Sequence, residues 1–179
     1  MNTEAALLRK IRCCIGIIIF GLIVGGATAI PLRAELDWLT GQLDPGRTDS
    51  LSLWLNKVRH ALDDTDAKYP FMAYGTDWLA FGHFVIALVF FWAWKDPARY
   101  AGLFNFGILA CVLIIPYAFM LGQLRQIPWG WRLIDCSFGL FGLVPLLLAR
   151  NWVQQLEARP QQSSMRSRGE VREGITQQR

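Results

Sequence analysis

Residues 74–94 read YGTDWLAFGHFVIALVFFWAW and join a polar rim to a long apolar run. From Trp78 to Trp94 this run has no formal charge and holds a single imidazole, that of His83. A helix of about 17 residues rises roughly 25 Å, which is close to the hydrocarbon thickness of a bilayer. The stretch therefore predicts a membrane-spanning helix.

Three further apolar runs have the same character, and Asp135 is the only charged residue in them. They are Cys13–Ile30, Tyr100–Leu124 and Leu133–Ala149. Each must be helical, because backbone groups in lipid have to be hydrogen-bonded within their own segment. We expect an all-α polytopic membrane protein, a four-transmembrane-helix bundle with spans at about 13–30, 77–94, 100–122 and 132–150.

The predicted domain organisation follows from these spans. Residues 1–12 form a short N-terminus, residues 13–152 form the transmembrane domain with an outer loop at 31–76, and residues 153–179 form a disordered tail rich in Gln, Ser, Arg and Glu. The 53% hydrophobic content is higher than an ordinary soluble domain of 179 residues carries. The net charge of +4 requires no nucleic-acid partner, because the basic residues lie at the ends of spans.

Basic residues also predict the orientation. The N-terminus, the 95–99 link and the tail hold 11 of the 18 Lys and Arg residues. Because the more basic side of a membrane protein faces the cytoplasm, both termini should be cytoplasmic and the 31–76 loop should face outward. We expect an integral multi-pass protein of a bacterial inner membrane, or of the endoplasmic reticulum if the source is eukaryotic.

The outer loop has a helical pattern of its own. Apolar side chains recur at helical spacing at Leu51, Trp54, Leu55, Val58 and Leu62, with Asp49 or Ser50 available as the N-cap. This pattern predicts an extracytoplasmic amphipathic helix that lies on the outer membrane face or covers the bundle. The turn before it is predicted at Asp44-Pro45-Gly46.

Motifs for cofactor or metal chemistry are not found in the sequence. The four cysteines show neither CxxC spacing nor a zinc pattern with histidine. There is no phosphate-binding loop and no Ser/His/Asp order typical of a hydrolase. We therefore expect no metal and no cofactor, and whether the chain is an enzyme stays open.

His83 is the most distinctive candidate residue, because an ionisable group within a span is costly unless it faces protein or water. Ala87, Phe90 and Trp94 share its helix face and would form the apolar wall of a lipid-like ligand pocket. Asp37 or Asp135 would be its acidic partner. The alternative is a neutral histidine that makes one hydrogen bond between helices.

Other polar residues gather at the predicted outer mouth of the bundle. Asp77 precedes the second span, and Arg132 and Asp135 open the fourth, three residues apart on one helix face. We expect these two to form a structural ion pair. Candidate ligand-binding residues are His83, Asp37, Asp77, Phe90, Trp94 and Asp135. In the first span, Gly21-x-x-x-Gly25 would let another helix approach closely.

Several of these landmarks resemble the EXPERA-domain family, which includes the emopamil-binding sterol isomerase and the sigma-two receptor type of proteins. Ile30-Pro31 followed by Asp37, the stretch LAFGHFVIALVFF, Ile115-Pro116, and Arg132-Leu133 followed by FGLFGLVPLLL are similar to family segments. The resemblance implies a four-helix fold with an intramembrane pocket for a sterol-like or amphipathic amine ligand, recognised by two carboxylates. Asp37 matches the first carboxylate, whereas His83 replaces the second.

The leading interpretation is a protein that binds a hydrophobic, sterol-like or lipid ligand in a cavity within the membrane, lined by His83, Phe90, Trp94 and the bends at Pro116 and Pro145. One alternative is an EXPERA-like double-bond isomerase, with Asp37 and His83 as candidate catalytic acid and base. Another is a non-catalytic subunit of a membrane complex. The expected partners are the lipid bilayer and a lipid-like small molecule, with a homo-oligomer or a membrane-protein partner left open.

Overall fold

The four predicted spans are confirmed in the computed structural model, which describes residues 3–42 and 49–177 and, beyond Ala158, the backbone alone. Within that part of the chain, four helices are long and apolar enough to cross a membrane, so the protein is a multi-pass membrane protein. They are α1 (Thr3–Ala29), α4 (Tyr74–Lys95), α5 (Gly102–Leu124) and α6 (Trp129–Gln177).

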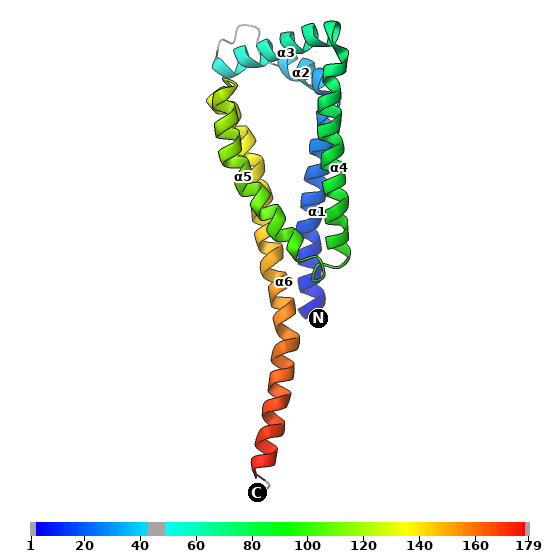
Figure 1. Ribbon diagram of the computed structural model, residues 1–179, viewed down its shortest axis with the longest axis vertical. Helices are drawn as coiled ribbons and strands as arrows, with labels where there is room; N and C mark the ends of the chain where they lie inside the picture. The colour runs from blue at the N-terminus through cyan, green and yellow to red at the C-terminus, as the bar shows by residue number, and fades with distance from the viewer. Residues whose placement is uncertain (1–2, 43–48, 178–179) are drawn as a thin grey trace.

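The four long helices pack mainly as neighbours in a row. α1 packs against both α4 and α6, and α5 packs against α6, so the order across the row is α4, α1, α6, α5. Figure 1 shows two legs, α1 with α4 and α5 with α6, which converge near the N-terminus and separate towards the other end. α4 and α5 stand at the two ends of this row, and they approach each other where the legs converge: an added Cβ on Gly107 of α5 would lie 3.1 Å from Phe90 Cζ of α4.

The buried core lies where the two legs converge. Ile11 and Ile15 of α1 are fully buried there, together with Phe104 near the start of α5. The same cluster contains Cys14, Phe90, Ala93, Leu146, Ala149 and Val153. α1 already begins at Thr3, so the described residues before the predicted span are helical, and Ile11 among them belongs to this core.

At the opposite end, α2 (Leu32–Gly41) and α3 (Ser50–Lys68) form a cap that joins the two legs (Figure 1). The helix predicted in this loop is present as α3, and its predicted N-cap is confirmed: the Asp49 carboxylate accepts a hydrogen bond from the Ser52 backbone N–H. The predicted turn at 44–46 lies outside the described residues.

Both ends of α3 are attached to the long helices. Near its start, the Trp54 ring lies against the Trp131 ring of α6, with centroids 4.9 Å apart. After its end, a short 3-10 helix, η1 (Pro70–Ala73), leads directly into α4. The cap thus spans the separated ends of the two legs.

The last helix extends beyond the predicted membrane span. Residues 153–177 continue the backbone of α6, whereas the sequence predicts a disordered tail. Gln, Glu and Arg favour this continuation, whereas Pro160, Gly169 and Gly174 disfavour it, so local helix propensity alone does not explain why α6 extends to Gln177.

Candidate functional site

His83 lies in the interface between α1 and α4. Its Nδ1 is 2.8 Å from the backbone carbonyl oxygen of Leu79, and because a carbonyl can only accept, Nδ1 carries the proton. Its ring edge faces Gly25, where an added Cβ would lie 3.5 Å from His83 Cδ2 and 3.7 Å from Nε2. Ala87 and Phe90, on the same face, are buried. At His83 this face of α4 packs against α1, whereas Phe90 belongs to the buried core and also lines the crevice between α4 and α5.

The close approach of α1 and α4 depends on Gly26 more than on Gly21. A Cβ at Gly26 would lie 2.8 Å from Phe84 Cε1 and 3.0 Å from the carbonyl oxygen of Ala80, whereas a Cβ at Gly21 would meet nothing within 4 Å. The Gly21-x-x-x-Gly25 spacing therefore does not mark the contact; Gly25 takes part in it and Gly21 does not.

Substituting Gly26 by alanine is expected to lower the free energy of unfolding by roughly 1–2 kcal/mol, because the added methyl group meets a backbone oxygen that cannot move independently of α4. Reversible unfolding in mixed detergent micelles would measure the change. Gly21→Ala is the matched control and should leave stability unchanged. Equal effects of the two substitutions would contradict this assignment of the interface.

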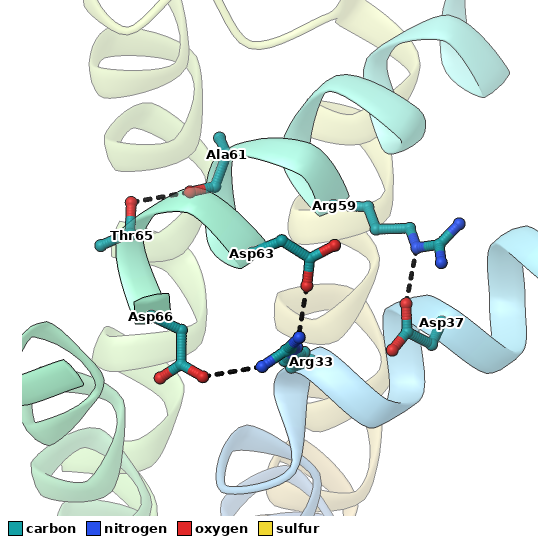
Figure 2. Close-up of polar contacts among 7 residues, drawn as sticks. All are labelled: Arg33, Asp37, Arg59, Ala61, Asp63, Thr65 and Asp66. Atoms are coloured by element: carbon teal, nitrogen blue, oxygen red, sulfur yellow. Dashed lines mark hydrogen bonds and ion pairs between the residues drawn. The ribbon is translucent and has the colours of Figure 1, made fainter. Parts of the chain in front are cut away.

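Asp37 is engaged within the cap. Its carboxylate accepts a hydrogen bond from Arg59 Nε of α3, and both side chains are partly exposed (Figure 2). Asp37 makes no hydrogen bond or ion pair with His83 in the described part of the chain. The acid and base of the isomerase hypothesis are therefore not brought into contact.

Arg33 makes the second connection between α2 and α3. Its Nε is 2.8 Å from Asp63 Oδ1, and its Nη1 donates a 2.8 Å hydrogen bond to Asp66 Oδ2 (Figure 2). The negative charge of Asp63, with a smaller contribution from Asp66, raises the pKa of Arg33 above its ordinary value. With Arg59 and Asp37, these contacts hold α2 and α3 together as one unit.

The predicted ion pair between Arg132 and Asp135 is not present. Arg132 is buried, and its Nε donates to the carbonyl oxygen of Ile127 at 2.7 Å while Nη1 donates to Gln123 Oε1 at 2.8 Å. Its aliphatic carbons lie over Gly122, where a Cβ would come within 2.8 Å of them. The reason is local. The turn between α5 and α6 places two neutral oxygen acceptors beside Gly122, and the guanidinium of Arg132 donates to these acceptors and not to Asp135.

An apolar crevice lies between α4 and α5, the two helices at the ends of the row. It has a volume of about 290 Å³ and is lined by Val85, Ile86, Val89, Phe90, Leu103 and Phe106. Every lining side chain is a hydrocarbon, so the crevice offers no polar group to a ligand. Phe90 lies five residues, about 7.5 Å of helical rise, before α4 ends at Lys95.

A second, shallower hollow of about 220 Å³ lies at the other end of α4. Asp77 is its one acidic lining residue, among the aromatic rings of Tyr74, Trp78 and Phe81. The rings of Tyr74 and Trp78 meet edge to face, as do those of Trp78 and Phe81. Aromatic residues of this kind are typical of the membrane interface.

The predicted ligand residues are thus distributed over several places. Phe90 lines the crevice, Asp77 lines the second hollow, and His83, Trp94, Asp37 and Asp135 line neither. Pro116 and Pro145 do not line either cavity. The sequence analysis did not identify the other residues that line the crevice. One feature of the sequence could have indicated them: the 96–101 link is short and must bring the end of α4 beside the start of α5.

In the described residues, no group of three or more His, Cys, Asp or Glu side chains could hold a metal ion. No family model, curated protein or solved structure matches the chain. The site is therefore interpreted from its own geometry.

Proposed function

We propose that this protein is a bacterial inner-membrane protein that holds a hydrocarbon chain of a lipid-like ligand in the crevice between α4 and α5. The single observation that carries the proposal is the wholly apolar lining of this crevice, which α4 and α5 share beside the close contact of Phe90 with Gly107. In this proposal both termini are cytoplasmic and the cap faces outward, as the distribution of basic residues favours.

The size of the crevice narrows the ligand class. Small-molecule sites usually measure about 300–1,000 Å³, so a volume of about 290 Å³ suits one acyl or isoprenoid chain better than a rigid polycyclic sterol. Because the lining has no polar group, the polar part of the ligand must lie outside the crevice. The nearby end of α4 would place that part at the membrane interface.

A photoreactive fatty acid with a diazirine on its chain tests the proposal in the purified full chain. Labelling should concentrate on the α4 and α5 peptides that line the crevice. Val89→Phe, which fills the crevice, should lower this labelling by about tenfold, the equivalent of ~1.4 kcal/mol.

The matched control is Leu88→Phe, because Leu88 is 56% exposed and does not line the crevice. Labelling should be the same in this variant as in the wild type. The proposal would be contradicted if labelling were spread evenly along the lipid-facing side of α5 and were unchanged by Val89→Phe. That result would favour the alternative that the protein is a non-catalytic subunit of a membrane complex.

A further inference from the structure

Cations lie over aromatic rings repeatedly at the end of the protein where the legs converge. Four such contacts are present there, with the charged group 4.8–5.7 Å from the ring centroid. The pairs are Lys10 with Trp152, Arg12 with Trp94, Lys95 with Phe91, and Arg99 with Tyr100. Contacts of this kind hold a charge beside an apolar surface at modest cost.

Two of these pairs join into one continuous stack along the edge formed by α1 and α4. The Phe91 and Trp94 rings are stacked, with centroids 5.9 Å apart and planes 9° apart. Lys95 lies over the first ring and Arg12 over the second. We call these four residues the cationic edge.

The backbone at the end of α4 fixes the position of Arg12. Its Nε donates to the carbonyl oxygen of Trp94 at 3.2 Å, and its Nη2 donates to that of Lys95 at 3.4 Å. These carbonyls have no partner within the helix, and a cation is favourable at a helix C-terminus. A guanidinium has five N–H donors, so the remaining donors of Arg12 can bind a further acceptor.

Within the described part of the chain, Arg12 and Lys95 form no ion pair with a carboxylate, and the neighbouring Asp96 accepts a hydrogen bond from the backbone N–H of Arg99. The ion pairs found there lie in the cap, where Arg33 and Arg59 bind aspartates, and none involves Arg12 or Lys95. Both side chains are exposed. Two exposed cations, backed by rings that are themselves 38–39% exposed, face the surroundings at the end of a membrane span.

We propose that the cationic edge binds the phosphate headgroups of anionic phospholipids. Its place at the end of two spans puts it at headgroup depth, and its two positive charges, which form no ion pair within the described chain, complement an anionic leaflet. Charged hydrogen bonds from guanidinium and ammonium groups to phosphate are strong and short. This inference concerns a surface other than the crevice and does not depend on what the crevice holds.

The test uses the purified full chain in mild detergent, titrated by native mass spectrometry with dioleoyl phosphatidylglycerol or dioleoyl phosphatidylcholine. Because the acyl chains are identical, the ratio of the two dissociation constants for the first bound lipid reports the headgroup alone. The wild type should prefer phosphatidylglycerol, more strongly at low salt. In R12Q/K95Q the preference should fall roughly 30-fold, as expected for two basic side chains near an anionic surface.

Three further variants locate the effect. K57Q/K68Q removes two exposed charges from the cap and should keep the preference. R12K/K95R keeps both charges and should keep most of it. K95Q alone leaves the Arg12 hydrogen bonds intact, and its preference for phosphatidylglycerol should be roughly fivefold lower than that of the wild type. This single variant still tests the inference if the double variant fails to fold.

Three results would overturn the inference. The first is equal affinity of the wild type for the two lipids. The second is an equal loss in K57Q/K68Q and R12Q/K95Q, because the preference would then follow net charge rather than this edge. The third is loss of binding of both lipids in all variants, because the substitutions would then affect lipid binding in general and not recognition of the headgroup.

Discussion

Arg132→Ala is expected to lower the free energy of unfolding by roughly 2–4 kcal/mol, the largest effect of any single charge removal in this protein. The buried guanidinium donates to Ile127 O and Gln123 Oε1, and hydrogen bonds to charged groups contribute about 1.5–3 kcal/mol each. Removing it leaves the turn between α5 and α6 without its closing contacts. Reversible unfolding in mixed micelles, followed by the signal of the tryptophans, would measure the loss.

The substitution Asp135→Asn distinguishes the arrangement of Arg132 in the structure from the Arg132–Asp135 ion pair that the sequence predicts. If Arg132 depended on Asp135, the two substitutions would cost similar amounts of stability. The structure instead gives Arg132 neutral oxygen partners, so Asp135→Asn should cause no loss. A loss of more than about 1 kcal/mol on Asp135→Asn would contradict the observed geometry.

Gly139→Ala is expected to lower the free energy of unfolding by about 2–3 kcal/mol, because it opens the contact between α5 and α6. A Cβ at this position would lie 2.7 Å from the backbone carbonyl oxygen of Cys111, and a backbone oxygen yields only if the whole helix moves. Thermal unfolding in detergent should show a lower midpoint for this variant.

Gly130→Ala is the matched control for this substitution. Gly130 lies in the first turn of the same helix, and an added Cβ there would meet nothing within 4 Å. Its midpoint should be unchanged or slightly higher, since alanine has the better helix propensity. A lowered midpoint in both variants would mean that α6 rejects alanine for a reason other than the contact with Cys111.

The spans could be predicted from the sequence because apolar runs of this length with at most one charged residue are typical of helices that cross a bilayer. The helix in the first loop was also predictable, since Asp49 supplies an N-cap before side chains at helical spacing. α2 was not predicted, because Leu32–Gly41 mixes charged and apolar residues over a short length and follows Pro31. Its stability depends on Arg33 and Asp37 meeting partners on α3, which no local pattern encodes.

Helix neighbours within the membrane could not be predicted for a different reason. Lipid is as apolar as the protein interior, so hydrophobic periodicity does not distinguish a packed face from a lipid-facing one. The face of His83, Ala87 and Phe90 illustrates this, because its apolar character fits a pocket wall and a helix contact equally well. The deciding feature is Gly26 on the opposite helix, which only the structure aligns with Ala80.

The position of α1 in the middle of the row has a consequence for how the protein is made. α1 precedes α4 and α6 in the chain, so these two neighbours leave the ribosome later, on the order of ten seconds at about 5–20 residues per second. During this interval α1 lies in the lipid without the two helices against which it packs in the folded protein. The span that contains α1 has a mean hydropathy of 2.1, against 1.5 for the span that contains α4, so the less apolar α4 can enter the membrane beside a helix that is already there.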